Sequence, residues 1–203
     1  MTLLVLGLSH KTAPIAQREK AALSEAETRS LLRDLMGAGV VAEAVALSTC
    51  NRTEVYASAA DASAAEDALG EALVAHTHIS EDELSCARYV LRDDRAATQL
   101  FRVTSSLDSM VVGESEIQGQ VRHAWEIAAE EGASGAILNQ LFRQALEVGK
   151  QVRAQTRIGA GSASVSAVAV ELAEEVLDDL PGCAVLVQYH TLILKIQLIP
   201  ELL

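Results

Sequence analysis

The chain has 203 residues, of which 50% are apolar and 3% aromatic, and its 28 acidic and 16 basic side chains leave a net charge of −12. The apolar content and only three prolines exclude a disordered or collagen-like chain, and no apolar run reaches the roughly 20 residues that cross a bilayer. The N-terminus lacks the basic start and cleavage site of a secretory signal, so we expect a cytoplasmic protein without a membrane anchor.

The first half of the chain predicts a small sheet with two helices. Ser24 and Glu27 form a capping box that begins the first helix, and Gly37 and Gly39 end it. In chain order the pattern predicts a strand at 2–8, a helix at 24–36, strands at 40–47 and 54–58, a helix at 63–76 and a strand at 87–91. The order β-α-β-β-α-β indicates an α+β fold of the ferredoxin-like split βαβ type, with two layers.

Beyond Asp93 the pattern is almost entirely helical, which predicts a helical extension of this domain. Glycines and a serine at 158–162 are typical of a hinge, and the apolar residues 183–187 predict the start of a buried strand. The predicted helices lie at 93–105, 117–131, 134–157 and 162–179.

Three cysteines are widely separated, without a CxxC pair or a histidine at ligand spacing, so neither a disulfide framework nor a metal site is expected. Cys50 lies in a polar loop between two predicted strands, where catalytic side chains are often placed. The neighbouring Arg52 would favour the reactive thiolate. A partly buried structural thiol explains the same position equally well.

Residues 107–120 mix small, acidic and amide side chains without a helical or alternating stripe. Gly113 and Gly119 would allow close approach of a ligand to the backbone. Glu114, Glu116 and Gln120 could bind an ammonium or hydroxyl group. The alternative is a helix–helix connection, with Ser115 as the cap and Glu116 in the first turn.

The negative charge is concentrated in two segments, since residues 54–85 hold eight acids and no base, and residues 161–203 hold six acids and one base. Elsewhere the chain is close to neutral. Four bases lie along one side of the predicted helix at 134–157, and they form either a solvated helix face or a phosphate-binding surface. This basic stripe consists of Arg143, Lys150, Arg153 and Arg157.

Four motifs resemble glutamyl-tRNA reductase in order and spacing: GLSHKTAP (7–14), STCNRTE (48–54), LDSMVVGESEIQGQ (107–120) and VGKQVRAQT (148–156). The resemblance covers residues 1–187. It implies an oxidoreductase that uses NADPH to reduce the glutamyl group of glutamyl-tRNA to glutamate-1-semialdehyde, the first step of porphyrin and other tetrapyrrole synthesis through 5-aminolevulinate.

The resemblance implies that Cys50 is the nucleophile, which forms a thioester with the glutamyl group before hydride reduces it. We expect Arg52 to bind the glutamate carboxylate and Glu114 to bind the α-ammonium, with the basic stripe as the candidate tRNA contact. The remaining substrate-binding residues that the resemblance implies are Thr49, Asn51, Ser109, Ser115, Glu116 and Gln120.

This chain departs from the family pattern at three places. Gln99 stands where a histidine important for activity is usual, so an acid–base role at this position is either lost or taken over by another group such as water. Ser106 replaces a common glycine. Gln188, Tyr189 and His190 replace the Gly-rich turn that would bind the NADPH pyrophosphate.

These departures lead to a three-part division of the chain. Residues 1–157 form the N-terminal catalytic domain, 158–187 the hinge, helix and first strand of an incomplete NADPH-binding domain, and 188–203 an unmatched tail. We expect the chain to keep the thioester-forming half of the reaction and no cofactor site. The alternatives are a non-catalytic tRNA-binding module and a glutamyl-tRNA esterase. Partners implied by the resemblance are glutamyl-tRNA, glutamate-1-semialdehyde aminotransferase and a second copy bound through a C-terminal region missing here.

Overall fold

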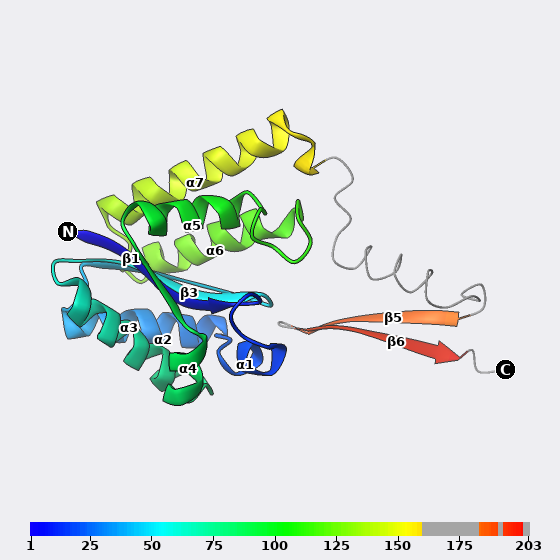
Figure 1. Ribbon diagram of the computed structural model, residues 1–203, viewed down its shortest axis with the longest axis horizontal. Coiled ribbons are helices and arrows are strands. Elements are labelled where there is room, and N and C mark those ends of the chain that lie inside the picture. Colours follow the sequence, from blue (N-terminus) through cyan, green and yellow to red (C-terminus); the bar gives the residue numbers. More distant parts are fainter. Residues whose placement is uncertain (160–182, 191–192, 201–203) are drawn as a thin grey trace.

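The computed structural model describes residues 1–159, 183–190 and 193–200 (Figure 1). Four strands form an antiparallel sheet in the order β2-β3-β1-β4, which is the predicted split βαβ arrangement. Strand β1 lies inside the sheet and pairs with β3 from Thr2 opposite Ala59 to Ser9 opposite Arg52. The strands are β1 (Thr2–Ser9), β2 (Glu43–Thr49), β3 (Arg52–Ala59) and β4 (Tyr89–Arg92).

Helices cover both faces of this sheet (Figure 1). One face carries α1 (Ile15–Lys20), α2 (Glu25–Ala38), α3 (Ala62–His76) and α4 (Glu81–Ala87). The helical extension covers the other face with α5 (Asp94–Thr104), α6 (Glu116–Glu130) and α7 (Ala136–Gln155), and the 3-10 turn η1 (Arg157–Gly159) follows α7. All eight residues of β3 are buried as a result. Strand β1 is buried from Leu4 to Ser9, and burial on both faces explains its unbroken apolar run.

The core joins the sheet to the second helical layer. Tyr56 of β3 and Phe142 of α7 are fully buried, and their rings meet edge to face with centroids 5.6 Å apart. Within the described residues, no helix is both long and apolar enough to cross a membrane.

The structure differs from the sequence prediction at several boundaries. The polar loop predicted between the second and third strands shrinks to Cys50 and Asn51, because β2 and β3 extend to Thr49 and Arg52. Helices α1 and α4 were not predicted. Helix α7 ends at Gln155, so Arg157 lies in η1 rather than in the helix.

Residues 183–200 form a separate antiparallel pair of strands, β5 (Cys183–His190) and β6 (Ile193–Pro200). The strand predicted at 183–187 is therefore longer than expected, and half of the tail without a family match, residues 193–200, is its pairing partner. The helix predicted at 162–179 and most of the predicted hinge lie outside the described residues.

Candidate functional site

Cys50 and Asn51 are the two turn residues that join β2 to β3. The Asn51 N–H donates to Thr49 Oγ1 at 3.2 Å, and the His10 N–H donates to the Asn51 carbonyl oxygen at 2.8 Å. Arg18 Nη1 donates to the Cys50 carbonyl oxygen at 2.8 Å and to Asn51 Oδ1 at 3.2 Å. Because the backbone of the turn is anchored from both sides, the exposed side chain of Cys50 is presented on a rigid support.

The surroundings of Cys50 disfavour its thiolate. Removal of water around the thiol and the nearby carboxylate of Glu114 both raise the pKa of Cys50, whereas the Arg18 guanidinium lowers it and Glu116 raises it further. Arg52, which the sequence predicts to promote the thiolate, is not among the groups with the largest effect on this pKa. The cation that acts on the thiol is Arg18, which sequence reasoning did not assign to the site.

The loop between α5 and α6 brings Glu114 to this position. Ser106 begins the loop in the left-handed region with φ 57°, and Gly113 ends it with φ 91°. The Ser106 hydroxyl accepts from the Gly113 N–H at 3.0 Å and donates to Ser109 Oγ at 3.1 Å. Glu114 is buried, and burial raises its pKa although Ser109 hydrogen-bonds to the carboxylate. The usual glycine at position 106 suits this left-handed backbone.

Arg153 is the further anchor of this loop, because its Nη1 donates to the carbonyl oxygens of Gly113 at 2.9 Å and Glu114 at 2.8 Å. Arg153 thus has a contact within the protein besides its predicted place in the basic stripe. The other members of the stripe, Arg143, Lys150 and Arg157, are exposed.

A buried ionic network lies at the base of the β2–β3 turn. Arg52 is 2% exposed, and its Nη1 donates to Glu54 Oε1 and to Asp108 Oδ2, each at 3.0 Å. Its Nη2 donates to the Asp108 carbonyl oxygen. Lys11 forms an ion pair with the same Asp108 carboxylate. Arg52 therefore turns its guanidinium into the protein rather than toward Cys50.

Gln99 bridges the two carboxylates of this network. Its Nε2 donates to Glu54 Oε1 at 2.9 Å and to Asp108 Oδ2 at 3.2 Å. Burial opposes the ionisation of Asp108, but hydrogen bonds and charges from Lys11, Arg52 and Gln99 outweigh it and lower its pKa to about 2. An uncharged amide at position 99 thus orients two carboxylates and carries no proton between them.

The structure brings part of the predicted site together. Thr49, Cys50 and Asn51 share one turn, and Glu114 faces that turn with Ser109 beside it. Ser115 is the exposed N-cap residue of α6 and makes no side-chain cap bond, whereas Gln120 lies half-buried in α6. Sequence reasoning missed Lys11, Arg18, Glu54 and Asp108 as members of the site. Three of them lie inside the matching motifs, which is the signal that could have identified them.

Comparison with known proteins places the chain in one family. The family model described as glutamyl-tRNAGlu reductase, N-terminal domain, matches residues 6–156. The chain belongs to the glutamyl-tRNA reductase family. It is 47% identical over 187 residues to the glutamyl-tRNA reductase of Rubrobacter xylanophilus and 42% identical over 186 residues to that of Pelobacter propionicus. In both comparisons 92% of this chain matches 43% of the relative, so the chain spans less than half the length of these relatives.

A solved glutamyl-tRNA reductase from Methanopyrus kandleri has the same fold. It superposes with a TM-score of 0.66 at 38% sequence identity, over 85% of this chain and 39% of that one. The split βαβ sheet with its helical extension is therefore the fold of this family's N-terminal domain.

The family resemblance implies NADPH, and residues 183–200 are where its pyrophosphate-binding turn was expected. Such a turn needs a strand, a Gly-rich loop and the N-terminus of a helix. Among the described residues, β5 is followed by the antiparallel strand β6, and residues 183–200 contain no glycine. This segment does not fit the cofactor, and we assign no part of the reaction to it.

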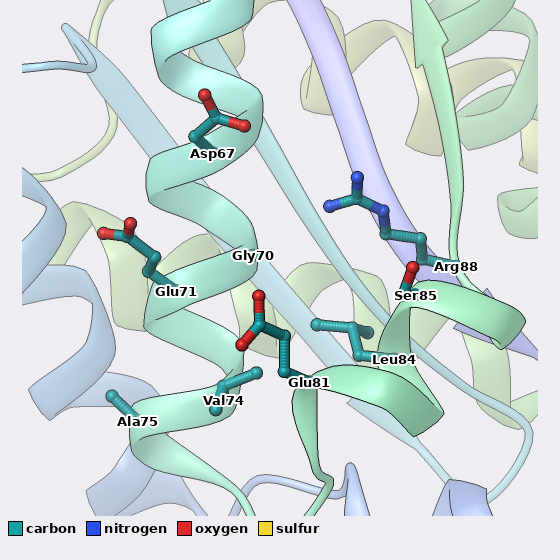
Figure 2. Close-up of a pocket in the computed structure, with 9 residues that line it drawn as sticks. All are labelled: Asp67, Gly70, Glu71, Val74, Ala75, Glu81, Leu84, Ser85 and Arg88. Atoms are coloured by element: carbon teal, nitrogen blue, oxygen red, sulfur yellow. The ribbon is translucent and has the colours of Figure 1, made fainter.

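Away from Cys50, a hollow of about 490 Å³ lies between α3 and α4 (Figure 2). The carboxylates of Asp67, Glu71 and Glu81 line it together with Arg88, which pairs with Glu66 at 3.5 Å. None of its lining residues belongs to the cluster around Cys50, and none was singled out from the sequence as a site residue.

Proposed function

We propose that this chain carries the acyl-transfer step of a glutamyl-tRNA reductase, in which Cys50 takes the glutamyl group from glutamyl-tRNA as a thioester. The exposed residue Cys50 on an anchored turn, with the buried carboxylate of Glu114 close enough to act on its thiol, is the observation that carries the proposal. The resemblance further implies reduction of that group to glutamate-1-semialdehyde with hydride from NADPH, the first step of tetrapyrrole synthesis. We assign only the acyl transfer to the described residues.

In the proposed step, Cys50 Sγ forms a bond to the carbonyl carbon of the glutamyl ester, and the ester C–O bond breaks. The leaving ribose oxygen of the tRNA takes up the proton that the thiol gives up and becomes a hydroxyl, and there is no net oxidation or reduction. The Arg18 guanidinium favours the developing thiolate, whereas Glu114 opposes it until an ammonium group neutralises its charge. A bound substrate ammonium would therefore activate the nucleophile.

The proposed recognition of the glutamyl group uses opposite charges at two points. Glu114 accepts the α-ammonium, and Arg52 contacts the side-chain carboxylate. Because Arg52 is buried and bonded to Asp108, this contact requires the substrate carboxylate to take the place of Asp108 on the guanidinium. The proposed lining is completed by Thr49, Asn51, Ser109, Ser115, Glu116 and Gln120.

The proposed tRNA contact is the basic stripe, whose exposed cations Arg143, Lys150 and Arg157 lie along α7 and just beyond its C-terminal end, with the half-buried Arg153 between them. The other finer expectations remain proposals that the resemblance supports. They are a cytoplasmic location, transfer of the product to an aminotransferase, a dimer formed through a C-terminal region, and the division of the chain at residues 157 and 187.

Incubation of the full chain with glutamyl-tRNA carrying a labelled glutamyl group tests the function. We expect a protein-bound label that neutral hydroxylamine releases, because thioesters react with it readily. Cys50→Ala abolishes the label, and the matched Cys86→Ala variant, which removes another exposed cysteine, retains it. Label retained by Cys50→Ala would refute the nucleophile assignment. Steady release of free glutamate without an adduct would instead support an esterase, and tRNA binding without either reaction would support a binding module.

A further inference from the structure

The loop that carries Glu114 has little apolar packing of its own. Leu107, Met110 and Val112 are large apolar residues in its middle, and their exposed fractions are 46%, 61% and 57%. Hydrophobic burial therefore does not hold this part of the loop in place. Its position depends on polar contacts at the two ends.

The C-terminal end of α7 contacts the C-terminal end of this loop. Arg153 Nη1 donates to both the Gly113 and Glu114 carbonyl oxygens, at 2.9 and 2.8 Å, although about 40 residues of chain separate donor and acceptors. The guanidinium is charged at all physiological pH values, so these are charge-assisted hydrogen bonds.

Close packing of the backbone reinforces the same contact. A Cβ added at Gly113 would overlap the carbonyl oxygen of Ile158, which belongs to η1 immediately after α7. A Cβ added at Gly149 would lie 2.8 Å from the Thr104 carbonyl oxygen, so α7 also packs directly against the last residue of α5, just before the loop. The end of α7 thus contacts the start and the end of the loop.

We propose that Arg153 is a positioning residue, which holds the loop so that the Glu114 carboxylate stays beside Cys50. Arg153 bonds only to loop carbonyls among the described residues, and it acts on Cys50 through the position of Glu114. The proposal rests on the proposed function only for its catalytic consequence, because the geometry concerns two groups of the free protein.

The thiol pKa of Cys50 reports the distance to Glu114 and needs no tRNA. It is measured from the pH dependence of alkylation by iodoacetamide, in a background in which Cys86 and Cys183 are serine. The charged groups that act on this thiol are Glu114 and Glu116, which raise the pKa, and Arg18, which lowers it. This double-serine protein is the parent for the comparison. In it, Glu114→Gln is expected to lower the pKa of the Cys50 thiol.

Arg153→Gln is expected to lower the thiol pKa as well, because the released loop carries Glu114 away. Loss of a positive charge alone would act in the opposite direction and raise it, so the sign of the shift separates the two explanations. In the Arg153→Gln background, Glu114→Gln should lower the thiol pKa by at most half as much as it does in the parent. Arg122→Gln, which removes an exposed guanidinium of α6, is the matched control and leaves the thiol pKa unchanged.

A raised or unchanged thiol pKa in Arg153→Gln, or a full effect of Glu114→Gln in that background, would overturn the proposal. If Arg153→Gln does not fold, Arg153→Lys answers the same question, since its ammonium lacks the planar fork yet keeps the charge. A thiol pKa below that of the parent supports the proposal, and an equal one contradicts it. The pKa measurement does not depend on formation of the labelled adduct. The positioning role of Arg153 and the proposed acyl transfer by Cys50 can therefore be refuted independently.

Discussion

At the scale of single residues, the ionic network under the Cys50 turn is the largest unexpected feature. Arg52 lies within a matching motif, yet its position two residues after Cys50 did not indicate which way its side chain points. In a strand, alternate side chains face opposite sides of the sheet, and the register of β3 places Arg52 and Glu54 on the same side. Only the fold reveals that Asp108 and Gln99 meet them there.

Asp108 makes stability dependent on pH in the acid range. Its pKa of about 2 in the folded protein lies below the ordinary value of 3.8, so its ionised form stabilises the fold above pH 3.8. This contribution of about 2 kcal/mol is lost as the pH falls from about 4 to about 2. We expect Asp108→Asn to flatten the pH dependence of the free energy of unfolding in that range, measured by urea denaturation. Asp67→Asn, which changes an exposed carboxylate that has no bonding partner among the described residues, is the matched control, and equal slopes in both variants would contradict the assignment.

Ser106 combines a strained backbone with useful hydrogen bonds. Ser106→Ala keeps the left-handed φ and loses the hydroxyl bonds, which should lower the free energy of unfolding by about 1–2 kcal/mol. Ser106→Gly loses the same bonds but relieves a strain of about 1 kcal/mol, so it should be the more stable of the two. Urea denaturation measures both. Ser85, inside α4, is the control position. There the alanine variant should be more stable than the glycine variant, because glycine destabilises helices. An alanine variant at position 106 as stable as the glycine variant would refute this account.

At the scale of elements, the capping signals in the sequence were reliable. The capping box of Ser24 and Glu27 is confirmed at the start of α2. The same pattern in Ser80 and Glu83 begins α4, which the sequence analysis does not predict because its seven residues are too few to show an apolar stripe. The N-terminus of α7 has no such local signal, since its N-cap residue is Gly135.

Glu43 of β2 supplies the missing cap of α7. Its Oε1 accepts from the Ile137 N–H at 3.1 Å and its Oε2 accepts from the Leu138 N–H at 2.6 Å. A carboxylate at a helix N-terminus stabilises the free N–H groups and the helix dipole. We expect Glu43→Ala to lower the free energy of unfolding by about 1–3 kcal/mol in urea denaturation. Glu126→Ala, at an exposed position of α6, is the control. A similar small loss in both would show that the cap contributes little.

At the scale of the whole molecule, the distribution of charge matters more than its sum. The acidic segment 54–85 forms much of α3 and α4, whereas the exposed cations of the stripe lie on α7 and η1, on the other face of the sheet (Figure 1). A net charge of −12 therefore does not exclude nucleic acid from the α7 side.

The proposed tRNA contact predicts a salt dependence of binding. Reversing Arg143 and Lys150 to glutamate should weaken tRNA binding and lower the slope of log affinity against log salt by about 2, or about one unit for each lost phosphate contact. Filter binding at several salt concentrations measures both quantities. Arg33→Glu on α2, across the sheet, is the control and leaves the slope nearly unchanged. An equal loss in the control would mean that only net charge acts.

The sequence by itself determined the order of the four sheet strands, the longer helices of the described domain and the family, because periodicity and motifs are local properties of the chain. Tertiary structure alone decided that Arg18 rather than Arg52 acts on the Cys50 thiol, that Arg153 anchors the Glu114 loop, and that Glu43 caps α7. These contacts join residues 32 to 95 positions apart, or change a pKa through burial. Neither effect can be predicted from the spacing of residues, since both depend on which surfaces the folded chain brings together.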